Sequence, residues 1–306
     1  MKIKNLSQNV LLIMALLLSI TAFFQSALAQ DTTFQVLAVD GDVSIKRTEA
    51  WLPLEAGQYI SQQDLIKLKD GAYLGMVHHT GHSLELRKTG TYEAGRLSQQ
   101  LGERKLNVAA KYASLYVGML KKGSIQQPAN GNLERTVQAN LLSVYLPNSV
   151  DVFNDEVIIR WKDDTQLAKN YEVKLKNMFN EVLDTKVVNS TKTSLNFNHE
   201  KIARERMIII SVSSQDFKDQ KSKDYGMKQL TPEEAEPIAQ ELSELKLEIS
   251  DQQSALDKLI LASFYEQNSL LADALTSYEH AIQMAPDVKA FRTAYDQFIF
   301  RNGLGN

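Results

Sequence analysis

The sequence contains no cysteine among its 306 residues. Disulfide bonds, thiolate nucleophiles, iron–sulfur clusters and cysteine-based zinc sites are therefore excluded, and so is a lipid anchor carried on a cysteine. A chain of this length without disulfides relies on its hydrophobic cores, as large domains of the bacterial periplasm do. The length favours about two to three domains.

An excess of positive charge is also absent. The 34 Lys and Arg residues stand against 37 Asp and Glu residues, and the formal net charge is −3. Loss of Lys2 and Lys4 with the N-terminal segment described next would make it −5. Proteins that bind nucleic acids present a basic face, so this balance argues against a nucleic-acid partner.

Long apolar runs are missing except at residues 10–20. This run is shorter than the ~18 residues that a membrane-spanning helix needs. It follows Lys2 and Lys4 and precedes Ala27-Leu28-Ala29, a pattern typical of a secretory signal peptide with its cleavage site. We predict a signal peptide over residues 1–29, with an uncleaved anchor as the alternative. The protein is then exported, with the periplasm as the expected location and the cell surface or secretion as alternatives.

Motifs of known enzymes are missing too. The sequence has no nucleophile elbow, P-loop, dinucleotide-binding fingerprint or His-Glu-x-x-His zinc motif. The acidic pair Asp163-Asp164 lacks the spacing of a calcium-binding loop. We therefore expect a protein that is not an enzyme and that needs no cofactor.

Short strand patterns dominate the first part of the chain. Residues 34–39 lead into Asp40-Gly41, and residues 42–46 then alternate polar and apolar side chains, which indicates a half-buried strand. An Asp-Gly pair supplies the positive φ that a tight hairpin turn needs. We therefore expect a β hairpin at this position.

A series of short motifs follows in a fixed order. These are Val39-Asp40-Gly41-Asp42-Val43, Trp51-x-Pro53-Leu54-x-x-Gly57, Asp64-Leu65-Ile66, Asp70-Gly71-Ala72 and Ser83-Leu84-Glu85-Leu86. Their order resembles the FecR-type domain of bacterial envelope proteins, although Gly81-His82-Ser83 stands where that family often has Asp-Gly-Ser. The resemblance implies an all-β domain over residues 30–95 and a cell-envelope setting.

The regulatory activity of FecR proteins does not follow from this resemblance. Those regulators are anchored in the inner membrane and act on a sigma factor through a cytoplasmic segment. Here the expected signal peptide is cleavable, so that mechanism is not carried over. Signalling through a separate membrane partner stays an alternative function.

The middle of the chain combines a helical and a second β pattern. Residues 96–122 have apolar side chains at helical spacing with Gly123 as a plausible C-cap, so residues 96–132 are read as a helix and a linker. Strand patterns then recur between turn residues across 133–229, which favours a β-sandwich. Trp161 and Tyr171 resemble the aromatic pattern of immunoglobulin- or fibronectin-like modules, and both rings are predicted to lie in the core.

Residues 230–306 carry helical patterns. Thr231-Pro232-Glu233-Glu234 forms a capping box at the start of a helix expected over 233–256, and a last helix is expected over 288–301. Between them the spacing resembles one tetratricopeptide unit, in which small residues let two helices approach and tyrosines fill the gap. The residues of this pattern are Ala262, Tyr265, Ala274, Tyr278, Ala281 and Pro286.

The first candidate site lies on this helical unit. A single repeat cannot bury its own face. The helix with Ala262 and Tyr265 is therefore expected to line a groove for a protein or peptide partner. The alternative is that the exposed faces of the unit dock another domain of the chain.

The second candidate site is a histidine pair. Residues 73–78 are expected to pair with residues 83–87 across a two-residue turn, which makes His79 and His82 cross-strand neighbours with Cβ atoms about 5 Å apart. Two such imidazoles could chelate a divalent metal, with His78 pointing to the opposite face. The alternative is an exposed polar hairpin tip.

The sequence thus predicts a multidomain protein with an all-β FecR-like domain, an immunoglobulin-like β-sandwich and an α-helical tetratricopeptide-like C-terminal module. The expected function is that of an exported, non-catalytic interaction or scaffold protein of the bacterial envelope, whose partner is a protein, a peptide or a glycan. The alternatives are an envelope signalling component, or an enzyme or metal-binding protein.

Overall fold

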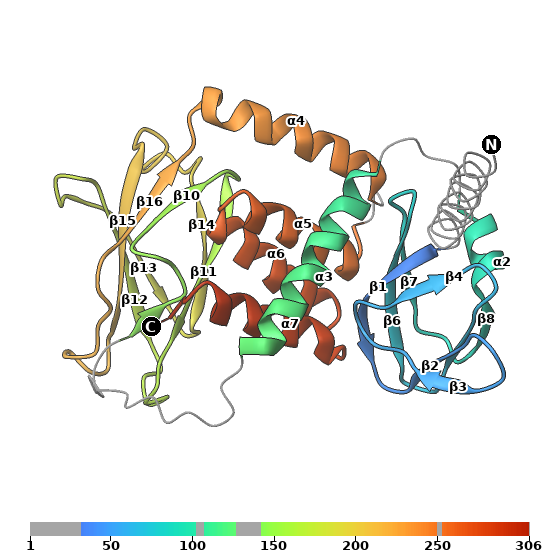
Figure 1. Ribbon diagram of the computed structural model, residues 1–306. Coiled ribbons are helices and arrows are strands. Elements are labelled where there is room, and N and C mark those ends of the chain that lie inside the picture. Colours follow the sequence, from blue (N-terminus) through green and yellow to red (C-terminus); the bar gives the residue numbers. More distant parts are fainter. Residues whose placement is uncertain (1–31, 102–106, 127–141, 250–252, 306) are drawn as a thin grey trace, which may run out of the picture.

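The computed structural model describes residues 32–101, 107–126, 142–249 and 253–305 (Figure 1). The expected signal peptide at residues 1–29 lies outside these ranges. No helix within them is long and apolar enough to cross a membrane. The described chain combines four β-sheets with helices that lie mainly in its C-terminal part. The expected mixture of β structure and C-terminal helices is confirmed at this level.

The first β region consists of two four-stranded sheets, in the orders β4-β1-β6-β7 and β3-β2-β5-β8, around one shared core. Side chains from both sheets, among them Phe34, Ile45 and Ile66, fill this core. The strands are β1 (Thr32–Asp40), β2 (Val43–Lys46), β3 (Trp51–Pro53), β4 (Tyr59–Ser61), β5 (Leu65–Leu68), β6 (Tyr73–His78), β7 (Ser83–Leu86) and β8 (Gly90–Glu93).

The turn at Asp40-Gly41 does not close a hairpin. Gly41 has the expected positive φ of 73°, but β1 and β2 belong to different sheets. A Cβ atom on Gly41 would lie 3.0 Å from the Cα atom of Ala72, so this glycine also permits a close approach of two backbones. The expected hairpin is therefore wrong, because the chain turns a corner from one sheet to the other.

Strand β6 is buried along its whole length, which strict alternation does not predict. Leu74 and Met76 belong to the core of the first β region, whereas Tyr73 and Val77 belong to the core formed by the helices. The part of this sheet formed by β1 and β6 is thus covered on both faces, and β6 is buried on both sides for that reason.

The single helix expected over residues 96–122 is two helices, α2 (Ala94–Gln99) and α3 (Val108–Gln126). Helix α3 runs through Gly123, so Gly123 is not its C-cap. Its buried face packs against α5, α7, β1 and β6. The residues of this face are Ala109, Tyr112, Ala113, Tyr116 and Val117. Helix α3 is therefore part of the helical core. The linker expected after it lies, from residue 127 on, outside the described ranges.

The second β region contains a five-stranded sheet, β10-β16-β15-β12-β13, and a three-stranded sheet, β14-β11-β9, which enclose a second core. Trp161 and Tyr171 lie in this core with ring centroids 5.4 Å apart, so their prediction as core aromatics is confirmed. The strands are β9 (Ser143–Val144), β10 (Ser149–Val152), β11 (Glu156–Lys162), β12 (Tyr171–Lys176), β13 (Val182–Val188), β14 (Lys192–Asn196), β15 (Met207–Ser214) and β16 (Tyr225–Gln229).

Four helices follow: α4 (Pro232–Glu248), α5 (Ala255–Gln267), α6 (Leu271–Met284) and α7 (Lys289–Arg301). The capping box at Thr231 is confirmed. The helix expected over 233–256 is wrong in its length, because a second capping box at Ser254 and Asp257 starts α5. Tyr265 on α5 and Tyr278 on α6 are both buried. Helix α7 packs on α6 with a buried face, as expected for 288–301, and its Tyr295 and Phe298 contact Tyr278.

Helices α3, α5, α6 and α7, called here the central helices, lie between the two β regions (Figure 1). Helix α6 contacts β10 and β11 of the second β region. Helices α3, α5 and α7 contact β1, β6 and β7 of the first. Because the C-terminal helices are in the middle, order along the chain does not match order in space.

Candidate functional site

The residues expected to line a peptide groove are not accessible. Ala262 is 0% and Tyr265 is 4% exposed. The Tyr265 ring packs against Phe264 and Phe153, and its hydroxyl donates to Oδ1 of Asn154 at 3.4 Å. The prediction of an open groove at Ala262 and Tyr265 is therefore wrong. The second β region and α3 occupy these faces, in line with the alternative that the helical unit docks other parts of the chain.

Helix α6 meets the second β region through a stripe of buried polar side chains three residues apart. Oδ2 of Asp273 accepts from the N–H of Phe153 at 3.0 Å, and Oδ1 accepts from the N–H of Asn154 at 2.9 Å. One turn later, the N–H of Ile158 donates to Oγ1 of Thr276 at 2.8 Å. These bonds satisfy backbone groups of β10–β11 that would otherwise be buried without partners.

The stripe ends in an ion pair. Arg160 on β11 donates to both carboxylate oxygens of Glu279, and Lys192 on β14 lies 3.2 Å from one of them. Burial alone would raise the pKa of the Glu279 carboxyl, but the hydrogen bonds and charges of Arg160 and Lys192 lower it on balance. Glu279 is thus a buried carboxylate with matched partners.

A second set of polar contacts joins the central helices to the first β region. Oε1 of Glu85 accepts from the N–H of Leu256 at 2.8 Å, at the start of α5. Ser83 donates to Oδ1 of Asp257 at 2.5 Å in the same turn. Oδ2 of Asp40 accepts from the N–H of Lys289 at 2.6 Å, at the start of α7. Carboxylates at helix N-termini are favoured there by the helix dipole, so both helix starts are held by charge-assisted bonds.

The histidine turn has a different register from the one expected. Val77 pairs with Ser83, and the N–H of His78 donates to the carbonyl of His82 at 2.8 Å. The turn therefore contains three residues, 79–81, and Gly81 takes the left-handed conformation with φ of 93°. His82 is opposite His78 rather than His79, so the cross-strand pair expected from the sequence is wrong.

His78, which was expected to point away, is the buried member of the group. Its Nδ1 lies 2.7 Å from the hydroxyl of Thr80, and its Nε2 lies 2.9 Å from the hydroxyl of Ser98 on α2. Burial, followed by the charges of His79 and His82, lowers the pKa of His78 to about 4. The Thr80 hydroxyl also lies 2.9 Å from Nδ1 of His82. Within the described ranges, no three His, Asp or Glu side chains are arranged to hold a metal ion.

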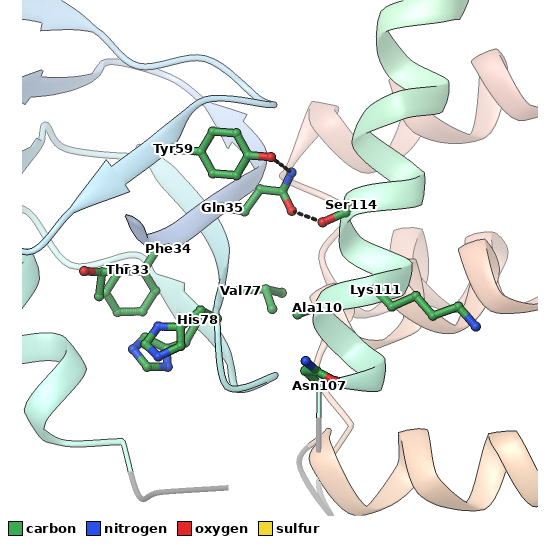
Figure 2. Close-up of a pocket in the computed structure, with 11 residues that line it drawn as sticks. Thr33, Phe34, Gln35, Tyr59, Val77, His78, Asn107, Ala110, Lys111 and Ser114 are labelled. Carbon is green, nitrogen blue, oxygen red and sulfur yellow. Dashed lines mark hydrogen bonds between the residues drawn. The ribbon is translucent and has the colours of Figure 1, made fainter. Parts of the chain in front are cut away.

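A cleft of about 320 Å³ opens beside this turn, between the first β region and α3 (Figure 2). Gln35 on β1 lies at its wall, where its Nε2 donates to the hydroxyl of Tyr59 at 3.2 Å and its Oε1 accepts from Ser114 on α3 at 2.9 Å. Lys111 extends away from the cleft (Figure 2). Also at the lining are Thr33, Phe34, Val77, His78, His79, Asn107 and Ala110.

Sequence reasoning found only the histidines of this cleft. Gln35, Tyr59 and Ser114 come from β1, β4 and α3, and no short motif joins them. The available signal was Gln35 itself, a polar residue inside an apolar strand, because a buried amide requires a partner.

No protein-family model matches this sequence. A search of curated proteins also found no match.

Proposed function

We propose that this is an exported, non-catalytic interaction protein of the bacterial cell envelope, in which the central helices hold two β modules as one scaffold. The observation that carries the proposal is the pair of polar interfaces on the central helices. Glu279 and Asp273 bind the second β region, while Asp257 and the start of α5 bind the first. Buried directional contacts of this kind favour one relative orientation over others.

The module likenesses support the same function. We infer that the first β region is FecR-like, that the second is an immunoglobulin-like sandwich, and that α5 and α6 form a tetratricopeptide-like pair. Units of these types serve mostly as binding or scaffolding parts. Fold alone does not establish the activity, so the proposal rests on the interfaces rather than on the likeness.

In this function the helical unit joins parts of the chain instead of binding an external peptide. Its apolar faces are used inside the chain, so an external partner contacts the outer surfaces of the β regions or the cleft beside the histidine turn. Tyr59 at that cleft is half exposed, and Asn107 and His79 add polar groups at its lining. A small cleft with an aromatic ring and a few polar groups is typical of a binding site.

The test is cross-linking and co-purification of the mature protein from the envelope of cells that express it. The intact protein is expected to retain a defined envelope partner. A variant with Glu279→Ala and Asp257→Ala weakens both interfaces and is expected to retain less of it, whereas the exposed substitution Asp151→Ala is the control. Equal retention by all three would contradict the scaffold role, and a membrane sensor as the partner would favour the signalling alternative.

A further inference from the structure

The outer face of the sheet β3-β2-β5-β8 carries a tryptophan among lysines. Trp51 on β3 is directly opposite Lys46 on β2, and Ser44 on β2 is directly opposite Lys67 on β5. Residues that are directly opposite in an antiparallel pair share one face. The residues between them, Ile45 and Ile66, point into the core, so Trp51 and the lysines point outward.

Strand β3 is exposed along its whole length. Trp51 is 38% exposed on the outer face, although a tryptophan is usually among the most buried residues of a sheet. A shallow cleft of about 580 Å³ lies here, and Ser44, Trp51, Lys67 and the ion pair of Lys69 with Asp42 are part of its lining, whereas Lys46 is outside it. An exposed apolar surface with a polar rim marks an interaction site.

The charge of this face is opposite to that of the chain. Nζ of Lys67 lies 5.6 Å from the centroid of the Trp51 ring. Lys69 pairs with Asp42, but in the part of the chain that the structure describes neither Lys46 nor Lys67 has an acidic partner. Lys67 thus lies over the Trp51 ring, and Lys46 is opposite Trp51 on β2, both without an ion-pair partner among the described residues. Glu93 on β8 shares this outward face but pairs with Arg96, so the unpaired charges here are positive in a protein whose formal net charge is −3.

We propose that this face binds an acidic saccharide, with a sugar ring against Trp51 and its carboxylate between Lys46 and Lys67. The C–H groups of a pyranose ring are positively polarised and complement the negative face of the indole. A carboxylate forms charge-assisted hydrogen bonds with ammonium groups. The Ser44 hydroxyl can donate to and accept from the sugar hydroxyls.

A peptide fits this face less well. Strand β3 is at the edge of its sheet but has only three residues, and it ends at Pro53, which has no N–H to donate. Addition of a peptide strand needs a row of free backbone donors and acceptors, which this edge does not offer. The side chains thus provide the recognition, and they match a ring with a negative charge.

The binding is independent of the scaffold function proposed above, because it involves no central helix. The probes are three acidic oligosaccharides, namely oligogalacturonate, oligoalginate and a heparin hexasaccharide. Methyl-esterified oligogalacturonate, which has no carboxylate charge, is the neutral match to the first of them and serves as the control ligand. The protein has two tryptophans, and Trp161 is buried, so a change in tryptophan fluorescence on binding reports Trp51. Calorimetry gives the affinities.

At least one acidic oligosaccharide is expected to bind at least 10-fold more tightly than the neutral match. Trp51→Ala is expected to weaken it at least 10-fold, and Lys46→Gln with Lys67→Gln is expected to remove the preference for the acid. Phe179→Ala, an exposed aromatic of the second β region, is the control and leaves binding unchanged. All these side chains are at least partly exposed, and thermal unfolding checks that each variant is folded.

Three results would overturn the proposal. The first is that none of the three acidic oligosaccharides binds. The second is that Trp51→Ala binds as well as the wild type. The third is that an oligoglutamate peptide of equal charge binds equally, since this would show attraction to charge without recognition of a sugar ring. A loss of envelope partners by the interface variants above would bear on the scaffold alone.

Discussion

The guanidinium of Arg160 donates to both carboxylate oxygens of Glu279, and the two residues are 119 positions apart in the chain. Glu279 is 1% exposed and Arg160 is 19% exposed. The pair joins the second β region to α6, so its loss affects the interface and not the interior of either part.

Glu279→Ala is expected to lower the free energy of unfolding by about 3 kcal/mol, because it leaves the partly buried Arg160 without its carboxylate partner. Adding Arg160→Leu is expected to recover part of this loss, since it removes the uncompensated charge. Urea unfolding of the wild type, both single variants and the double variant completes the cycle. Strictly additive effects of the two substitutions would contradict the ion pair.

Asp273→Ala tests the same interface at its backbone contacts. It removes the acceptor for the N–H groups of Phe153 and Asn154 and for the Asn154 side-chain amide. A loss of about 2 kcal/mol of unfolding free energy is expected, because these partly buried donors lose their acceptor. Asp151→Ala on neighbouring β10 is exposed and is expected to change stability little. Urea unfolding measures both, and equal effects would argue against the interface.

Local chemistry in the sequence predicted local structure well. The capping box at Thr231 starts a helix, Gly41 has a positive φ, and Trp161 with Tyr171 lies in a core. In each case the cause is a few neighbouring residues or a hydrophobic pattern along one element. Neighbouring residues and hydrophobic patterns of this kind can be read directly from the sequence.

Pairing between distant segments was not predictable in the same way. The Asp-Gly pair sets a turn at Gly41, but not the sheet that the next strand joins. The tetratricopeptide-like spacing predicts that two helices pack together, but it does not predict which element covers the face of Ala262 and Tyr265, which was expected to be open to a partner. Gln35, Tyr59 and Ser114 meet in a cleft only because α3 packs on β1, a contact that no local pattern encodes.

Gly81→Ala and Gly71→Ala form a matched pair of variants. Both glycines have a positive φ, of 93° and 72°, so both substitutions introduce the strain of a left-handed backbone, about 1–2 kcal/mol. At Gly71 a Cβ atom meets nothing within 4 Å. At Gly81 it overlaps Oε2 of Glu248, whose carboxylate accepts from the N–H groups of Val108 and Ala109 at the start of α3.

Gly81→Ala is therefore expected to lower the free energy of unfolding by about 2 kcal/mol more than Gly71→Ala, because Glu248 must leave the N-terminus of α3. Urea unfolding measures both. Equal effects of the two substitutions would show that the histidine turn and Glu248 are not in contact.

The pH dependence of stability tests the burial of His78. In the folded protein the pKa of His78 is lowered to about 4, by burial first and then by the charges of His79 and His82. In the unfolded chain it is about 6.5. Between these values the unfolded chain binds a proton that the folded protein does not, so stability falls as the pH decreases from about 6.5 to about 4.

His78→Gln removes this proton while its amide can still bond one of the two hydroxyls, of Thr80 or Ser98. The wild type is expected to be the more stable of the two at pH 7, and this advantage is expected to shrink as the pH falls to about 4. His199→Gln, at an exposed position of the second β region, is the control and is expected to show the same pH dependence as the wild type. Urea unfolding at pH 7, 5.5 and 4.5 measures the three proteins. The free energies of unfolding of the wild type and of His78→Gln could instead change with pH in parallel. His78 would then accept a proton equally well in the folded and unfolded chain. That result would contradict its buried position between Thr80 and Ser98.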